Sequence, residues 1–372
     1  MRHRRRGTGE TRATALASRI AATVLLAALA GTAGCSSAGG RQAPARPGSL
    51  AANVAAAPTT KAALAGTSPA SGAGAPAGAA SPAGAVSPAG AASPAGAVSP
   101  AGAASPRGIT SLSGPIVALG DSYTAGDLLP VSLSTPLGCL RSSLDYPQLV
   151  ARALHDRGGL VNASCESAGV ADMTSTEHTS AGQNPPQLNS LSANDALVLL
   201  TLGGDDLGFL NVLDKCMGLS WKDLLGSPCR SYYDSGGTDK LAALVTAEAP
   251  RIAAVLAQIH ARAPGARVLL VGYPDLFPQR GGCWPVVPIT DGDISYLRGI
   301  EVKFNAMLAA EAKATGTTFV DTYDPTIGHD FCASAKVKDV EGLIPTTLTA
   351  PFHPNARGQA ALATQVLKAL AA

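Results

Sequence analysis

The sequence has few aromatic and few charged side chains. Aromatic residues make up 4% of the 372 positions, charged residues make up 15%, and the formal net charge is +2. Beyond the N-terminus the chain has no basic stripe of the kind that contacts a phosphate backbone. The scarcity of aromatic residues also argues against a platform on which single-stranded bases stack. We therefore expect no nucleic-acid partner.

The apolar stretch near the N-terminus is too short to span a bilayer. Residues 20–30 fall short of the about 20 apolar residues that a membrane helix needs, and they lie between the basic residues 1–6 and a run of small residues. This layout predicts a signal peptide over residues 1–34. Cys35 directly follows Thr-Ala-Gly and resembles the cysteine of a bacterial lipobox. We expect export and a lipid anchor at Cys35 on the outer face of the cell membrane. The alternative is an ordinary signal peptide cut nearby, which gives a secreted protein.

Bulky apolar side chains are nearly absent from residues 35–113. The segment is rich in Ala, Pro, Gly and Ser, and the hexamer S-P-A-G-A-[AV] occurs four times within residues 81–104. Because glycine does not occupy every third position, the repeat is not collagen-like. With so little apolar surface to bury, the segment is expected to be a disordered tether. A tether of about 75 residues reaches on the order of 50 Å; low-complexity drift without a function is the alternative.

The sequence also lacks the cysteine spacing of a metal site. Six cysteines remain besides Cys35, no two of them have C-x-x-C spacing, and no histidine lies at ligand spacing from a cysteine pair. An even number of cysteines in an exported chain indicates disulfides. Oxidised cysteines exclude a cysteine nucleophile. The six are Cys139, Cys165, Cys216, Cys229, Cys283 and Cys332.

Apolar runs alternate with amphipathic stretches from residue 115 onward. Glycine or proline ends several of these runs, as at positions 120, 203, 264 and 272. Strands that alternate with helices predict an α/β fold with a parallel sheet covered on both faces. We expect one folded domain over residues 114–372, with Pro354 at the first position of its last helix. The expected strands are 116–119, 196–202, 267–271 and 318–321, and the expected helices are 146–155, 241–263, 294–314 and 354–371.

Two polar motifs follow buried strands of this predicted sheet. Gly-Asp-Ser at 120–122 follows the first strand, and Gly-Gly-Asp-Asp at 203–206 follows the second. Ligands of such sheets bind at the carboxyl ends of the strands. A serine on a tight strand-to-helix turn exposes its hydroxyl there, beside a helix N-terminus that favours negative charge. Taken alone, G-D-S occurs in many turns, and the G-x-S-x-G elbow of α/β-hydrolases is absent.

A serine nucleophile needs a base, and histidine is the usual one. The chain has six histidines. Four of them lie at the N-terminus, on polar helical stretches or in a polar loop, which leaves His329 and His353. His353 precedes Pro354 at the turn into the last helix, where a parallel sheet can bring it beside the end of the first strand.

Three motifs, taken in their order along the chain, resemble the SGNH (GDSL) hydrolase family. G-D-S-Y at 120–123, G-G-D-D at 203–206 and F-H-P-N at 352–355 are similar to its first, third and fifth sequence blocks. The resemblance covers nearly all of residues 115–372. Four further segments, together with the order of the six cysteines, resemble the secreted actinobacterial lipase and esterase branch. They are residues 165–168, 263–268, 272–274 and 319–321.

The resemblance implies a fold, a cysteine pairing and the absence of cofactors. The implied fold is a three-layer α/β/α sandwich with a parallel, about five-stranded, flavodoxin-like sheet. No metal and no other cofactor is implied. The implied disulfides are Cys139–Cys165, Cys216–Cys229 and Cys283–Cys332.

The resemblance also implies roles for individual residues. Ser122 attacks the ester carbonyl, and His353 takes its proton and returns it to the leaving alcohol. The backbone N–H of Ser122 is one oxyanion donor. The second donor falls on the backbone N–H of Ser167, where the family usually has Gly. The third, usually an Asn side chain, falls on Asp205.

Asp205 departs from the family pattern. An ionised carboxylate has no proton to donate, and at about 4 Å it repels an oxyanion by about 4 kcal/mol for an effective dielectric of about 20. Losing one oxyanion donor costs about 2.7–4 kcal/mol. Asp205 is therefore expected either to turn away or to be held protonated by an apolar site, as a neutral acid that donates a hydrogen bond.

Ala350 is the second departure, because the family usually has Asp three residues before the histidine. We expect the main-chain carbonyl of Ala350 to orient His353 and the enzyme to work as a Ser–His dyad. Asp321, Asp324 and Asp330 are nearby acids that would replace the missing one if the dyad interpretation were wrong.

The function expected from these residues is that of an exported serine ester hydrolase. Its substrate class is an acylglycerol, a phospholipid or an acylated glycan, and the lack of a long apolar lid segment favours short or soluble esters. We expect a monomer. Two alternatives remain: a degenerate domain that binds a glycan or lipid without turnover, and an acyltransferase that uses the same dyad. Tyr123, Asp206 and Trp284 are candidates for the pocket lining, with packing as the alternative role of each, and Tyr273 and Asp275 belong to the same class.

Overall fold

The computed structural model describes residues 112–130, 135–155 and 158–372. The predicted signal peptide, the lipobox cysteine Cys35 and the six-residue repeats lie outside the described residues. The folded domain predicted for residues 114–372 is described except for two short gaps.

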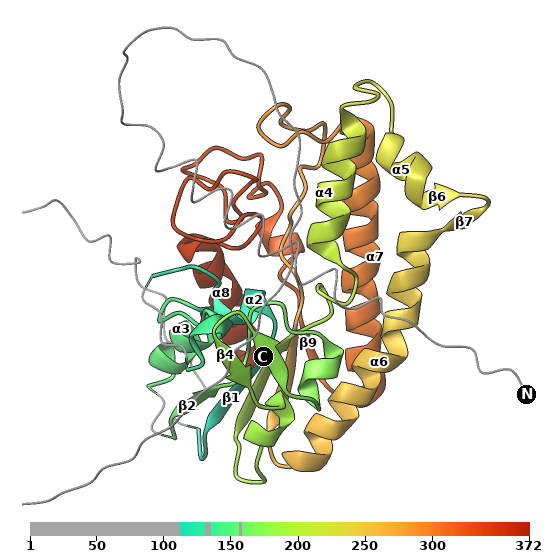
Figure 1. The fold of residues 1–372 in the computed structure, drawn as a ribbon. Helices are drawn as coiled ribbons and strands as arrows, with labels where there is room; N and C mark the ends of the chain where they lie inside the picture. The colour runs from blue at the N-terminus through green and yellow to red at the C-terminus, as the bar shows by residue number, and fades with distance from the viewer. Residues whose placement is uncertain (1–111, 131–134, 156–157) are drawn as a thin grey trace, which may run out of the picture. The chain divides into compact units, whose positions relative to one another are not determined.

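A five-stranded sheet forms the centre of the domain (Figure 1). Every neighbouring pair of strands in it is parallel, and the strand order is β2-β1-β5-β8-β9. Side chains of β1 and β5 are buried along the whole of each strand, as expected for a parallel sheet with both faces covered. The strands are β1 (Ile116–Gly120), β2 (Leu160–Asn162), β5 (Leu197–Thr201), β8 (Arg267–Val271) and β9 (Thr318–Val320).

Helices cover both faces of the sheet, which makes three layers. Because successive side chains of a strand point to opposite faces, Leu197 and Leu199 of β5 pack in the core with α3 and α8, while Val198 and Leu200 pack with α6 and α7. The predicted α/β/α sandwich is therefore confirmed. The α-helices of the described residues are α2 (Ser122–Ala125), α3 (Tyr146–Ala153), α4 (Phe209–Ser220), α5 (Pro228–Tyr233), α6 (Lys240–Arg262), α7 (Asp291–Thr315) and α8 (Ala356–Ala371).

Two small antiparallel hairpins and four 3-10 turns complete the elements of the described part. The hairpins pair β3 (Glu177–Thr179) with β4 (Gly182–Asn184) and β6 (Asp234–Ser235) with β7 (Thr238–Asp239). The 3-10 turns are η1 (Leu137–Cys139), η2 (Val170–Met173), η3 (Gln187–Ser190) and η4 (Asp324–Thr326).

The last helix begins later than predicted. Its N-cap is Asn355, whose side chain accepts hydrogen bonds from the backbone N–H groups of Arg357 and Gly358. Pro354 lies before this cap and forms an isolated bridge with Val340. An asparagine side chain satisfies free N–H groups of a first turn, whereas proline only removes one. The prediction that placed Pro354 at the first helical position is therefore wrong by two residues.

Three disulfides join the cysteines in the pairs that the family resemblance implied. Cys139–Cys165 links η1 to the loop after β2. Cys216–Cys229 closes the loop between α4 and α5, and Cys283–Cys332 ties the loop before α7 to the segment after η4.

Helix α6 is long and apolar enough to cross a membrane by length and composition, and within the described ranges no other helix passes that test. In the fold it packs Leu241, Ile252, Leu256 and Ile259, among others, into the core beside α7. Its apolar composition is thus explained by packing within the domain.

Candidate active site

The parallel register of β1 and β5 places their carboxyl ends side by side. The two strands pair from Ile116↔Leu197 to Gly120↔Thr201. Asp121 and Ser122 follow directly after the last pair on one strand, and Gly203–Asp205 follow on the other. The two polar motifs that the sequence singled out therefore meet at one edge of the sheet.

Ser122 is the first residue of the short helix α2. Asp121 caps this helix, and its carboxylate accepts the backbone N–H of Tyr123 at 3.0 Å. Gly120 makes the sharp turn possible, because its φ is +124° and a Cβ there would lie 2.0 Å from the carbonyl oxygen of Thr201. The turn holds the Ser122 side chain at the sheet edge with 6% of its surface exposed.

His353 lies against Ser122 although 231 residues separate them. Ser122 Oγ is 2.7 Å from His353 Nε2, and His353 Nδ1 is 2.8 Å from the carbonyl oxygen of Pro351. A carbonyl only accepts, so Nδ1 carries the proton and Nε2 is free to accept the serine hydroxyl. Burial lowers the pKa of His353 to about 4, so the ring is neutral and basic at neutral pH.

The carbonyl that orients His353 belongs to Pro351, which corrects the expectation for Ala350. The Ala350 carbonyl instead accepts the backbone N–H of His353 at 3.2 Å. Phe352 has a φ of +61°, and this left-handed residue turns the chain so that the carbonyl before it faces the ring. Sequence spacing alone does not reveal such a turn.

Acids near His353 in the sequence do not reach its ring in the fold. Both ring nitrogens are already engaged. The carboxylate of Asp321 caps the turn at Tyr323, and that of Asp330 accepts the backbone N–H of Cys332. His329 bonds the carbonyl of Val337 instead. In the part of the chain that the structure describes, Ser122 and His353 thus stand as a pair without a third, acidic member bonded to the ring.

Two backbone N–H groups near the serine lack acceptors among the described residues. Ser122, as the first residue of α2, has no acceptor within the helix. Ser167 has a φ of +64°, the left-handed conformation in which glycine is usual, and no acceptor is recorded for its N–H. The Ser167 hydroxyl is turned to Glu166 Oε1 at 2.5 Å. Free N–H groups at such positions can bind an anionic oxygen.

Asp205 lines the same pocket as Ser122 and His353. No hydrogen bond of its carboxyl group is recorded among the described residues, while its backbone carbonyl accepts the N–H of Gly208 at 2.9 Å. Burial raises the pKa of Asp205 well above its ordinary value, and several nearby carboxyl groups raise it further. These neighbours are Asp121, Glu166, Asp206 and Glu177. The carboxyl group is thus in the pocket wall and favours its protonated form.

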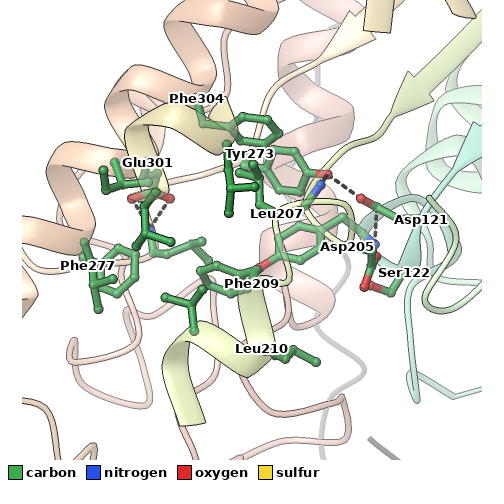
Figure 2. A pocket seen from close by; sticks show the side chains of 18 of the residues that line it. Asp121, Ser122, Asp205, Leu207, Phe209, Leu210, Tyr273, Phe277, Glu301 and Phe304 are labelled. Atoms are coloured by element: carbon green, nitrogen blue, oxygen red, sulfur yellow. Dashed lines mark hydrogen bonds between the residues drawn. The ribbon is translucent and has the colours of Figure 1, made fainter. Parts of the chain in front are cut away.

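A hydrogen-bond chain that the sequence did not reveal supports this edge of the site. The Tyr273 hydroxyl donates to the Asp121 carboxylate and accepts the backbone N–H of Gly204 at 2.9 Å (Figure 2). Asp121 is 1% exposed, and burial raises its pKa to about 7 against the opposing effect of the Tyr273 hydrogen bond. The chain ties the helix that bears Ser122 to the loop that bears Asp205.

An apolar pocket opens from Ser122 between α4, α6 and α7, with an enclosed volume of about 70 Å³. Phe209 and Phe277 lie in its wall in Figure 2, as does Glu301, whose carboxyl group accepts the backbone N–H of Leu276 at 3.2 Å. Burial raises the pKa of Glu301 well above its ordinary value, so this group too favours its neutral form. The apolar lining includes Leu207, Phe209, Leu210, Val212, Leu241, Leu244, Leu276, Phe277, Leu297, Ile300 and Phe304.

Of the five residues considered for the pocket lining, Tyr123 and Tyr273 lie there and the other three do not. Asp206 accepts the backbone N–H of Val170 at 2.9 Å and pairs with Arg251 at 2.7 Å, outside the pocket. Trp284 is a surface residue. Asp275 accepts the backbone N–H of Gly328 at 3.0 Å instead. Glu301 was not singled out for this site, because a glutamate on a helix carries no distinguishing sequence pattern.

Comparisons with known proteins agree with this geometry. Residues 118–361 match the GDSL-like Lipase/Acylhydrolase family. Lipase 2 of Streptomyces coelicolor is 34% identical over 259 residues, which cover 68% of this chain and 85% of that protein. The crystal structures of phospholipase A1 from Streptomyces albidoflavus NA297 and of an extracellular lipase from Streptomyces rimosus are similar, with TM-scores of 0.55 and 0.56 and identities of 26% and 25%. Each covers 69% of this chain and 98% of the solved chain.

Proposed function

The chain belongs to the GDSL-like lipase/acylhydrolase family and is a carboxylic ester hydrolase, and from this premise we propose that it is an exported enzyme that cleaves esters through an acyl intermediate on Ser122. The resemblance drawn from the three sequence blocks is confirmed by the family match.

His353 acts first as the general base and then as the general acid. It takes the proton of Ser122 Oγ as that oxygen attacks the ester carbonyl, and it returns the proton to the leaving alcohol oxygen. A water molecule, deprotonated by the same Nε2, then attacks the acyl-serine, and the proton passes to Ser122 as the acid leaves. The 2.7 Å separation of Ser122 Oγ from His353 Nε2 is the observation that carries this mechanism.

The free N–H groups of Ser122 and Ser167 stabilise the oxyanion of each tetrahedral intermediate. Donors fixed in place before the reaction stabilise developing charge without reorganisation. Protonated Asp205 supplies the third donor, in the role that the family gives to an asparagine amide. Its raised pKa and its unpaired carboxyl group at the pocket wall support this role.

The Pro351 carbonyl does the work of the missing acid. It fixes the tautomer of His353, but as a dipole it stabilises imidazolium less than a full charge does. We therefore expect a working dyad whose turnover is lower than that of an otherwise equal triad.

The apolar pocket favours an acyl lipid over an acetylated glycan as the substrate. Most of its lining consists of leucine, isoleucine, valine and phenylalanine side chains, from α4, α6, α7 and the loops before α4 and after β8, and these suit a hydrocarbon chain. Similar solved structures include a phospholipase A1 and a lipase from Streptomyces species. An acylglycerol or phospholipid is thus the proposed substrate class.

Export rests on the signal-peptide layout of residues 1–34 and on the likeness to an extracellular lipase. Lipid anchoring at Cys35 rests on the lipobox resemblance alone. Metabolic labelling with a radioactive fatty acid tests it: label in the wild-type chain and none in Cys35→Ser supports the anchor, and equal label in both contradicts it.

A panel of p-nitrophenyl esters of increasing chain length tests the proposed function, with Ser122→Ala as the matched variant. Hydrolysis by the wild type that is lost in Ser122→Ala supports a serine esterase. Hydrolysis that is equal in the two proteins contradicts it. Absence of hydrolysis in both favours a domain that binds without turnover, and transfer of the acyl group to an added alcohol in preference to water favours an acyltransferase.

A further inference from the structure

Two loops at one end of α4 expose large apolar side chains to solvent. They are the loop between α4 and α5 and the loop that precedes α7. We call the five most prominent side chains the tryptophan patch: Trp221, Leu224, Leu225, Trp284 and Val286, with exposed fractions of 63%, 54%, 99%, 37% and 58%. Isolated apolar side chains on a surface are common, whereas a group of this kind marks an interaction site.

The two loops of the tryptophan patch meet and are held in place. The rings of Trp221 and Trp284 contact each other edge to face with centroids 4.6 Å apart. The Cys216–Cys229 disulfide closes one loop, and Cys283–Cys332 anchors the other. Because the loops are cross-linked, they present the apolar side chains on a preformed surface, which lowers the entropic cost of binding.

Helix α4 joins the tryptophan patch to the active-site pocket. Its first residue, Phe209, lines the pocket, and Trp221 follows its last residue, Ser220. Twelve helical residues span about 18 Å. In Figure 1 the α4–α5 loop lies at the upper end of α4, while β1 and the short helix α2 lie near its lower end. A flat surface that contacts the tryptophan patch therefore lies about one length of α4 from the near end of the pocket.

The charge of these loops indicates what covers them. Residues 217–228 carry one lysine and one aspartate, and residues 283–290 carry no charged side chain. A net charge of zero does not select a polyanion or an oppositely charged protein. Tryptophan, with an apolar body and a polar N–H, is the residue type that concentrates at the boundary between hydrocarbon and water.

We propose that the tryptophan patch docks the domain on a zwitterionic or neutral lipid surface. Apolar side chains enter the headgroup boundary as those of an interfacial anchor do. The docked domain holds its pocket close to the surface from which an acyl ester is drawn. The proposal extends the proposed function by naming the surface, but docking itself does not depend on hydrolysis.

Intrinsic fluorescence tests the proposal directly, because the chain has two tryptophans and both belong to the patch. The full chain carrying Ser122→Ala is mixed with phosphatidylcholine vesicles, with and without bromine on the acyl chains. We expect a blue shift with plain vesicles and quenching with brominated ones, unchanged between 0.1 M and 1 M NaCl. Binding through the N-terminal residues alone gives sedimentation with the vesicles but no quenching, and that result overturns the proposal.

Leu225→Asp is the informative variant, since the side chain is 99% exposed and its loss leaves the core intact. Burying a leucine side chain is worth about 1.5–3 kcal/mol, so we expect at least about tenfold weaker vesicle binding. Leu137→Asp is the matched control: this leucine is 64% exposed and lies in η1, which contacts β4. It should bind as the parent does.

Kinetics separate this proposal from the proposed function. Without the Ser122 substitution, Leu225→Asp should hydrolyse monomeric p-nitrophenyl butyrate at the parent rate and a vesicle-embedded ester about tenfold more slowly. If Leu225→Asp hydrolysed each substrate at the parent rate, docking through the patch would be contradicted, and the esterase activity would still stand. A blue shift that grows with protein concentration in the absence of lipid shows that a second copy covers the patch, and it overturns the lipid assignment.

Discussion

The Tyr123 hydroxyl donates a 2.7 Å hydrogen bond to the carbonyl oxygen of Phe352, and this bond ties the residue after the serine to the residue before the histidine. The Tyr123 ring also lies beside that of His353, with centroids 5.1 Å apart. Phe352 is held at a φ of +61°, a conformation that costs energy for a non-glycine residue. Tyr123 therefore acts as a positioning residue for the loop that carries His353.

Tyr123→Phe removes this hydrogen bond and keeps the ring. A hydrogen bond of this type contributes about 0.5–1.5 kcal/mol, so we expect kcat to fall about two- to tenfold with a smaller change in KM. Steady-state kinetics on p-nitrophenyl butyrate measure it. Tyr232→Phe, at an exposed tyrosine, is the control and should not change either constant. A larger effect on KM than on kcat would mean that Tyr123 acts on substrate binding instead.

Asp205→Asn supplies an oxyanion donor that does not titrate. We expect turnover to rise at pH values where Asp205 is ionised, by up to the about hundredfold to thousandfold that one donor is worth. At acidic pH, where Asp205 is protonated, the two proteins should be about equal. A pH series of kcat for both proteins measures this. Lower turnover of Asp205→Asn at every pH would show that the carboxyl group has a different role.

The pH profile of the wild type should have two limbs. Below a pKa of about 4 His353 is protonated and inactive as a base, so kcat/KM rises as the pH passes through that value. On the alkaline side, Asp121, whose pKa is about 7, and Asp205 lose their protons. The negative charge that they then carry lies near the oxyanion and lowers the activity. Stopped assays from pH 3 to pH 9 measure both limbs. A plateau through pH 9 would contradict the role of these carboxyl groups.

Acids outside the site should not matter for turnover. Asp321→Asn and Asp330→Asn are expected to change kcat by less than about twofold, because neither carboxylate reaches the ring of His353. His353→Ala should lose at least about a thousandfold. Thermal melts of the three variants control for folding. If either aspartate variant lost as much as His353→Ala, the enzyme would not be a dyad.

The pocket volume should set the acyl-chain preference. Val212 lines the pocket from α4 and is only partly buried, so a larger side chain there narrows the space without overpacking the core. We expect Val212→Phe to keep butyrate hydrolysis within about twofold and to lower kcat/KM for octanoate about tenfold or more. A chain-length series of p-nitrophenyl esters measures the ratio. An unchanged ratio would place the acyl chain elsewhere.

The sequence predicted four strands of the sheet, including the edge strand β9, and missed the other edge strand, β2. Strands such as β5 are buried on both faces and appear as continuous apolar runs, which are visible without a structure. β2 is three residues long, partly exposed, and has no such run. α4 was not predicted either, although Phe209, Val212, Leu213, Cys216 and Met217 recur at helical spacing and pack into or against the core.

The proposed catalytic pair could be predicted from the sequence, but the residues that support it could not. Ser122 and His353 belong to short motifs whose order along the chain is specific. The orienting carbonyl depends on the left-handed turn at Phe352, which no pattern encodes. The contact of Tyr273 with Asp121 joins residues 152 positions apart, and only the fold brings them together.

Mass spectrometry of the intact protein after treatment with a fluorophosphonate tests the central claim, that Ser122 is a nucleophile activated by His353. The account predicts one adduct, mapped to the peptide that contains Ser122, absent from Ser122→Ala and formed about a thousandfold more slowly in His353→Ala. An adduct on another residue, or no adduct on the folded wild-type chain, would contradict it.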